Sequence, residues 1–227
     1  LFFNWLHTIW KGSLRMTTPM LFSLGLIFVF GLGGLTGIYL ATIGTDIFLH
    51  DTYFVVGHFH LTMAASALFG VFAGTYFWFP KMFGRMMSER LGKIHFWGTI
   101  ITLTVVFCTM FVSGWSGMPR RYYDHTSAQY LQDLQWLNKM TTHSALLLGA
   151  FQLVFAWNFI KSRWWGKPAG ENPWEVGTLD WAMPTPVPYY NFKEIPTVHT
   201  GPHEFSHPAL GPDRDWISQT EEMPAGA

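Results

Sequence analysis

The sequence HDTYFVVGHFHLTMAASALFGVFAGTYFWFP, residues 50–80, places two histidines inside a long apolar stretch. From Thr52 to Pro80 there is no Asp, Glu, Lys or Arg, and the stretch is long enough to cross a bilayer as a helix. His58 and His60 are two residues apart, which on an α-helix turns their side chains about 200° from each other. One short piece of helix would therefore present an imidazole to each of two bodies on its opposite sides.

Three further stretches lack charged residues, and each provides the roughly 20 residues that a spanning helix needs. Only 12% of the 227 residues are charged, against roughly 25% in soluble domains. The formal net charge of zero gives no reason to expect nucleic-acid binding. We therefore predict an all-α membrane protein with four transmembrane helices of a larger helical bundle. The predicted helices cover residues 18–42, 53–81, 92–116 and 129–160.

Basic residues in the predicted connectors favour one orientation in the membrane. Most of them precede the first helix, join the second to the third or follow the fourth, which the positive-inside rule assigns to the cytoplasm. Residues 1–163 would form the membrane part, and residues 164–227 a Pro-rich, extended cytoplasmic tail with little structure of its own. Arg120 and Arg121 are exceptions on the opposite side, where they predict an anionic partner. The basic residues on the cytoplasmic side are Lys11, Arg15, Lys81, Arg85, Arg90, Lys93, Lys161, Arg163 and Lys167.

Ionisable side chains at membrane depth usually mark function, so His58 and His60 are the first candidates for chemistry. Neutral imidazole is a standard axial ligand of haem iron, and two such residues at this spacing favour haem ligation. Phe59 would then lie close to both macrocycles, although ordinary packing also explains a phenylalanine there. The alternative for the histidines is a pair of polar residues hydrogen-bonded inside the bundle.

His50 and Asp51 lie at the outer end of the second predicted helix. An adjacent imidazole and carboxylate suit a hard cation such as Mg²⁺ or Mn²⁺. Asp51 followed by Thr52 is also good helix N-cap chemistry, and the residues alone slightly favour the cap. Both possibilities stay open at this point.

Arg120 and Arg121 are adjacent guanidinium groups at the same end of the bundle. Guanidinium forks bind carboxylates bidentately, so haem propionates would account for the pair. A lipid phosphate would account for it equally well without the histidines. Asp46 would either join the same outer network or face water.

Weaker signals indicate packing more than chemistry. The single cysteine, Cys108, excludes a disulfide framework and a thiolate metal site. His95 and His143 are each solitary, and we expect both to be hydrogen-bonded within the bundle. The first predicted helix has a face of small residues for close helix packing, namely Gly31, Gly33, Gly34 and Gly37. In the tail, an intervening glycine and proline argue against the helix that would align a metal site from His199, His203 and His207.

Two motifs, HDTYFVVGHFH (50–60) and SGMPRRY (116–122), resemble the C-terminal half of subunit I of haem–copper terminal oxidases of the cytochrome c oxidase type. The resemblance runs from Trp5 through GGLTG (33–37) and KIHF (93–96) to the end of the fourth predicted helix. The tail segments that resemble the family are NPWE (172–175) and TLDW (178–181).

The resemblance implies a role for each residue of the histidine motif. His58 would be the axial ligand of the high-spin haem at the oxygen-reducing centre. His60 would be one of the two axial ligands of the low-spin haem, and Phe59 would lie between the haems.

The resemblance also implies roles at the outer end of the bundle. His50 and Asp51 would be ligands of a Mg²⁺ or Mn²⁺ site shared with subunit II, which for Asp51 favours the metal over the cap. Arg120 and Arg121 would bind haem propionates in a region of proton exit, with Asp46 in the same network.

The activity implied by the resemblance is that of a proton-pumping oxidoreductase. Electrons would pass from cytochrome c or quinol through the low-spin haem to a haem–copper centre that reduces O₂ to water, with both haems of the a type. The implied partners are the remainder of subunit I, subunits II and III, and the lipid of a bacterial or mitochondrial inner membrane. A nitric oxide reductase-like protein is an alternative that HDTYFVVGHFH argues against. A non-redox transporter with a histidine proton relay is another.

The chain also departs from the family's pattern. The copper ligands, the cross-linked tyrosine and the second low-spin haem ligand belong to helices that would precede Leu1. Leu1 itself stands where the family usually has a proton-channel lysine, in register with FNWL (3–6). We therefore do not expect this chain to reduce oxygen by itself.

Overall fold

The described part of the chain is mainly helical up to Trp165. The computed structural model describes residues 1–126, 128–202, 204–205, 208–210 and 214–224, so His203 and His207 of the tail lie outside it. The α-helices are α1 (Phe2–Ile9), α2 (Thr18–Ala41), α3 (Ile43–Leu49), α4 (Tyr53–Phe59), α5 (Ser66–Phe83), α6 (Glu89–Trp115), α7 (Gln129–Gln132), α8 (Gln135–Trp165) and α9 (Leu179–Ala182). The remaining elements are the π-helix η1 (His60–Ala65), the 3₁₀-helix η2 (Pro208–Leu210), and strands β1 (Arg85–Met86) and β2 (Lys167–Pro168).

Among the described residues, four helical segments are long and apolar enough to cross a membrane, which confirms the predicted number and fold class. They are Thr18–Ala41, Tyr53–Phe83, Glu89–Trp115 and Gln135–Trp165. The predicted start of the fourth helix at residue 129 is wrong. The short helix α7 ends at Gln132, and α8 begins only at Gln135. Between them the chain turns through i→i+3 hydrogen bonds from Leu134 N–H to the Leu131 carbonyl and from Leu137 N–H to the Leu134 carbonyl.

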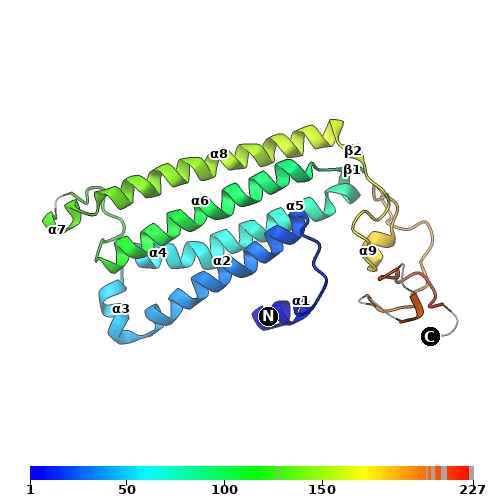
Figure 1. Cartoon of the computed structure of the whole chain (residues 1–227), viewed down its shortest axis with the longest axis horizontal. Coiled ribbons are helices and arrows are strands. Elements are labelled where there is room, and N and C mark those ends of the chain that lie inside the picture. Colours follow the sequence, from blue (N-terminus) through cyan, green and yellow to red (C-terminus); the bar gives the residue numbers. More distant parts are fainter. Residues whose placement is uncertain (127, 203, 206–207, 211–213, 225–227) are drawn as a thin grey trace. The chain divides into compact units, whose positions relative to one another are not determined.

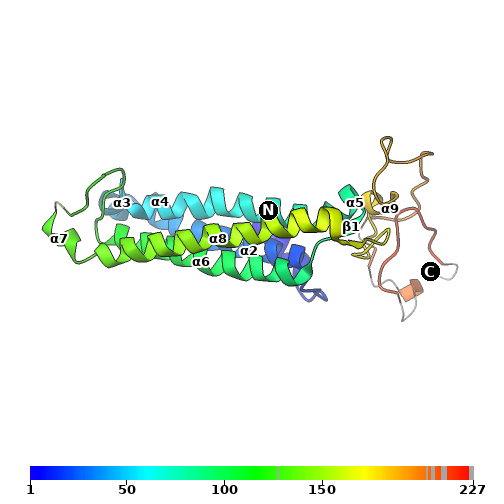
Figure 2. The same cartoon turned by 90° about the horizontal axis from the view of Figure 1, so that it is seen from above.

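The chain forms two compact units, and the first contains residues 1–76 and 89–158. Within it α2, α4, η1 and α6 lie side by side (Figure 1). Figure 2 shows α8 running along α6, and two hydrogen bonds join these helices, Thr109–Thr141 at 2.7 Å and Gln152–Thr99 at 3.1 Å.

Glycines allow the closest approaches between the helices of this unit. A Cβ at Gly33 would lie 2.8 Å from Leu61, and one at Gly37 would lie 3.0 Å from His58. The predicted small-residue face of α2 is therefore confirmed at these two positions. Gly34 does not belong to it, because a Cβ there would meet no described atom within 4 Å.

The second predicted helix contains a π-helical segment that the sequence analysis treated as α-helix. Four buried residues, Gly57, Leu61, Ala65 and Phe69, are spaced four apart along it. An α-helix has about 3.6 residues per turn, so three successive steps of four would rotate this row away from the core. The wider turn of η1 takes up the extra residue and keeps the row on one face.

The second compact unit contains residues 77–88 and 159–227. Strand β1 pairs with β2 in antiparallel register, Arg85 opposite Pro168 and Met86 opposite Lys167. Outside these strands the described tail is mostly irregular, as expected. The predicted division at residue 163 into membrane part and tail stays a prediction, because compactness does not report where a membrane ends.

The sequence analysis counted Lys81 among the residues that join the second and third helices. In the structure it lies in the last turn of α5, where its side chain is buried. Its ammonium group donates to the carbonyl of Trp181 at 3.3 Å and to that of Met183, and it lies 5.1 Å from the Trp181 ring centroid. Buried cations require such partners. The tail thus supplies the carbonyl oxygens that this lysine needs.

Candidate functional site

His58 lies in the last turn of α4, and its ring packs against α2. Its Nδ1 is 2.8 Å from the Gly33 carbonyl oxygen and 3.0 Å from the Thr36 hydroxyl oxygen. A carbonyl oxygen can only accept, so Nδ1 carries the proton and donates it. In a neutral imidazole with this hydrogen bond, the lone pair is on Nε2.

His60 follows at the start of η1, and its ring packs against α6. The ring stacks on Phe107 with centroids 5.4 Å apart and planes at 25°, and it also contacts Phe59 at 4.3 Å. Its Nδ1 is 2.8 Å from the Val56 carbonyl oxygen and donates to it. This imidazole, too, has its lone pair on Nε2.

The two rings thus contact different helices, as the two-residue spacing predicts: His58 contacts α2, and His60 contacts α6. Both rings are half-buried, and Phe59 between them is 37% exposed. A metal-ligating histidine almost always donates its other ring N–H to a carbonyl or carboxylate, which fixes the tautomer. The residues present therefore fit axial ligation of haem iron, one ring nitrogen for each iron.

The described residues include no group of three or more His, Cys, Asp or Glu side chains that could hold a metal ion. Single-nitrogen ligation of two haems does not require such a group.

At the outer end of the bundle, Asp51 pairs with Arg120. The Asp51 carboxylate accepts from Arg120 Nε at 2.8 Å and Nη2 at 2.5 Å, and the Asp51 carbonyl accepts from the Arg120 main-chain N–H at 2.9 Å. Of the two possibilities left open for Asp51, the N-cap is not its role: Thr52 caps α4, its hydroxyl accepting from Phe54 N–H at 3.2 Å. Asp51 itself has a φ of 55°, a left-handed conformation outside the helical region, and its carboxylate contacts Arg120 instead.

His50 joins Asp51 to Asp46. Its Nε2 is 3.4 Å from the Asp51 carboxylate, and its Nδ1 is 3.9 Å from that of Asp46. An imidazole and carboxylates suit a hard cation, but the described donors are too few for a complete shell, so further ligands would come from elsewhere. Arg121 is exposed, with a φ of 69°, and its charge also acts on the Asp51 carboxylate, more weakly than that of Arg120. Asp51 is the anionic partner that the structure provides for Arg120.

The Arg120 guanidinium holds the pKa of the Asp51 carboxyl below its ordinary value of 3.8, chiefly through their hydrogen bonds. A folded-state pKa below 3.8 stabilises the fold at pH values above 3.8, and this stabilisation is lost as the pH falls through the lower, folded-state value.

We expect R120Q to lower the unfolding temperature of the solubilised complex at neutral pH. The difference from wild type should shrink below pH 3.8. The pH dependence is the control: a difference between R120Q and wild type that stayed the same below pH 3.8 would contradict the pairing.

Two solitary histidines serve other purposes. His95 is fully buried and hydrogen-bonds Gln152 at 3.2 Å and Tyr76 at 3.3 Å, which confirms its predicted place in the bundle. His143 is hydrogen-bonded on α8, as expected, its Nδ1 donating to the Lys139 carbonyl at 2.7 Å, but its side chain is exposed among the described residues.

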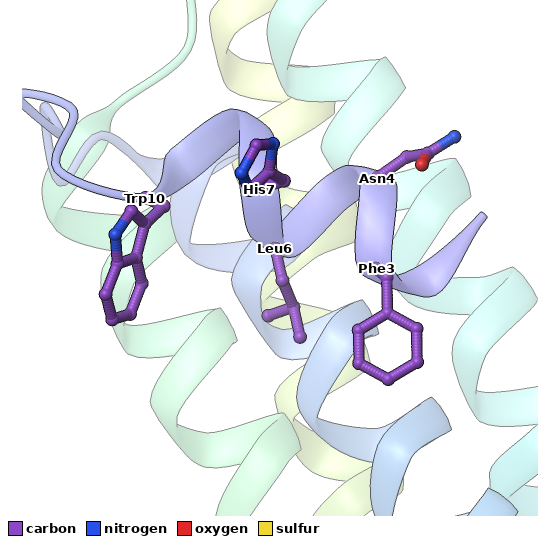
Figure 3. A pocket seen from close by; sticks show the side chains of 5 residues that line it. All are labelled: Phe3, Asn4, Leu6, His7 and Trp10. Atoms are coloured by element: carbon purple, nitrogen blue, oxygen red, sulfur yellow. The ribbon is translucent and has the colours of Figure 1, made fainter.

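Two hollows lie away from the paired histidines. One of about 300 Å³ follows α1 (Figure 3) and is lined by Phe3, Asn4, Leu6, His7 and Trp10. The other, of about 340 Å³, is lined mainly by polar side chains, namely Tyr53, Met110, Ser113, Tyr122, Tyr123, His125, Asn138, Thr141 and Thr142. Neither is lined by His58 or His60.

Sequence reasoning missed the groups that orient the two imidazoles. Gly33 and Val56 act through main-chain carbonyls, which carry no side-chain signal. Thr36 was detectable only as part of the GGLTG motif, and Phe107 resembles any other aromatic of an apolar helix.

Comparisons with known proteins show the family to which the chain is similar. The model of the family described as cytochrome c and quinol oxidase polypeptide I matches residues 1–147. The alternative cytochrome c oxidase subunit 1 of Bradyrhizobium diazoefficiens is 40% identical over 228 residues, covering 99% of this chain and 38% of that protein. Cytochrome c oxidase subunit 1 of Corynebacterium diphtheriae is 43% identical over 201 residues, covering 88% of this chain and 35% of that protein.

A solved structure of a heme-copper terminal oxidase dimer matches with a TM-score of 0.59 and 22% identity, covering 67% of this chain and 28% of that one. This match concerns the fold alone. The chain spans 38% and 35% of the length of the two relatives above, well under half.

Proposed function

Because the chain belongs to the cytochrome c and quinol oxidase polypeptide I family, whose members bind haems and copper, we propose that it is the haem-holding C-terminal part of subunit I of a respiratory terminal oxidase. In the whole enzyme, electrons from cytochrome c or quinol reach a haem–copper centre that reduces O₂ to water while protons are pumped. The remainder of subunit I supplies the copper ligands, and subunits II and III complete the assembly in the inner membrane, with the tail of this chain cytoplasmic.

One observation carries the proposal: His58 and His60 each donate Nδ1–H to a main-chain carbonyl and so keep Nε2 free, on two sides of one membrane-spanning helix. His58 would hold the iron of the high-spin haem, and His60 would be one of the two protein ligands that hold the iron of the low-spin haem, both haems being of the a type. When bound, the haems supply reversible one-electron chemistry. The chain orients the two imidazole planes, and Phe59 lies between the two haem positions.

The outer residues neutralise and order the charges of the bound groups. Arg120 and Arg121 hold haem propionates, and the Asp51 carboxylate, with Asp46 nearby, keeps Arg120 in place. His50 and Asp51 contribute to a Mg²⁺ or Mn²⁺ site that ligands from subunit II complete.

The test is the spectrum and composition of the purified complex that contains this chain. We expect two haems per copy of the chain, one low-spin and one high-spin, with O₂ consumption driven by a reduced donor. A complex without a Soret band would reject the proposal in favour of a transporter with a histidine proton relay. A complex with non-haem iron in place of copper that reduces NO would reject it in favour of a nitric oxide reductase.

A further inference from the structure

We propose that Thr36 is a positioning residue for the His58 imidazole, its hydroxyl oxygen serving as a second acceptor for the Nδ1–H group. The proposal rests on the proposed function of His58 as an iron ligand. It assigns to α2 a part in setting how strongly that ligand donates to the iron.

The direction of each hydrogen bond follows from the three atoms that meet here. The Thr36 hydroxyl donates to the Gly33 carbonyl at 2.6 Å, which commits its only proton. The oxygen of Thr36 therefore faces His58 Nδ1, 3.0 Å away, with a lone pair. His58 Nδ1–H is shared between this oxygen and the Gly33 carbonyl, 2.8 Å away.

The same turn of α2 also limits the movement of the ring. The χ2 torsion of histidine is broad, so its ring plane is set by contacts more than by rotamer preference. A Cβ at Gly37 would lie 3.0 Å from His58 Cε1, so the ring edge rests directly on the backbone of α2. Gly33, Thr36 and Gly37 thus provide a carbonyl, a hydroxyl and the space for the ring.

The hydroxyl has an electronic consequence as well as a geometric one. Hydrogen bonding from the distal N–H of a ligating histidine raises the basicity of the ligating nitrogen. With two acceptors at Nδ1, His58 is a stronger donor at Nε2 than it would be with the Gly33 carbonyl alone. A stronger donor stabilises ferric iron and so lowers the midpoint potential of the haem.

The experiment compares T36A, T36V and T36S in the complete oxidase by resonance Raman and redox titration of the high-spin haem. In T36A we expect the iron–histidine stretching frequency to fall and the midpoint potential to rise. T36S retains the hydroxyl and should remain close to wild type. The matched control is T75V, because Thr75 also donates to its own helix, at the Val71 carbonyl 2.7 Å away, but does not contact His58.

Wild-type frequency and potential in T36A would overturn the proposal, as would equal shifts in T36S and T36A. T36V replaces the hydroxyl by a methyl group that would press on Nδ1, which is a steric effect of its own. If the T36V oxidase does not assemble, the result for T36A alone tests the proposal. H58A separates this proposal from the proposed function. If the iron–histidine band persists in H58A, His58 is not the ligand and the proposed function fails. If the band is lost in H58A but T36A is unchanged, only the role of Thr36 is refuted.

Discussion

Replacing His60 by alanine is expected to remove the low-spin haem signal from the assembled oxidase while the high-spin haem bound by His58 stays detectable. The two rings pack against different helices and have separate carbonyl partners, so loss of one leaves the other's support intact. Losing only the hydrogen-bond partner of a metal ligand typically lowers metal affinity or activity about 10–100-fold. Loss of the ligand itself should therefore reduce O₂ consumption by more than ~100-fold.

The measurement is the reduced-minus-oxidised spectrum, with haem content determined on the same preparation. His143→Ala is the matched control, because His143 is exposed on α8 and bonds only the Lys139 carbonyl in the described part of the chain. H58A should give the reciprocal result, with the low-spin haem retained. An unchanged low-spin spectrum in H60A would contradict the assignment of the two histidines.

The membrane helices and the divergent directions of the two imidazoles were predictable from sequence because each depends on local chain properties. The length of an uncharged apolar run sets whether it can span a bilayer, and a spacing of two sets the angle between His58 and His60. The pairing of Asp51 with Arg120 was not predicted. These residues are 69 positions apart, and their contact depends on how the loop after α6 folds back to the start of α4.

The π-helix η1 and the start of α8 were missed for a related reason. A π-helical turn has no residue preference strong enough to read directly. Its signal is the row of buried residues spaced four apart from Gly57 to Phe69, and this row is recognisable only once the core is known. Before α8, apolar residues such as Leu131 continue a helical pattern across the turn, so periodicity alone extends the helix too far.

Gly114→Ala should prevent α4 and α6 from packing, with loss of both haems from the complex. A Cβ at Gly114 would lie 2.0 Å from the main-chain nitrogen of Phe54 and 2.7 Å from its Cα. Backbone atoms cannot move aside as a flexible side chain can, so the first turn of α4 would have to shift. Overpacking typically costs about 1–3 kcal/mol, and we expect this substitution to reach at least the upper end of that range.

Gly149→Ala on α8 is the matched control, because a Cβ there would meet no described atom within 4 Å. Alanine favours a helix over glycine by about 1 kcal/mol, so this change should be neutral or slightly stabilising. Both variants make the same glycine-to-alanine change, so a loss of stability in G114A but not in G149A would be due to the steric contact and not to the change in backbone freedom. The measurements are the unfolding temperature and the haem content of each solubilised complex. If G114A retains its haems and its stability, the close contact of α4 with α6 does not hold the histidine-bearing helix in place.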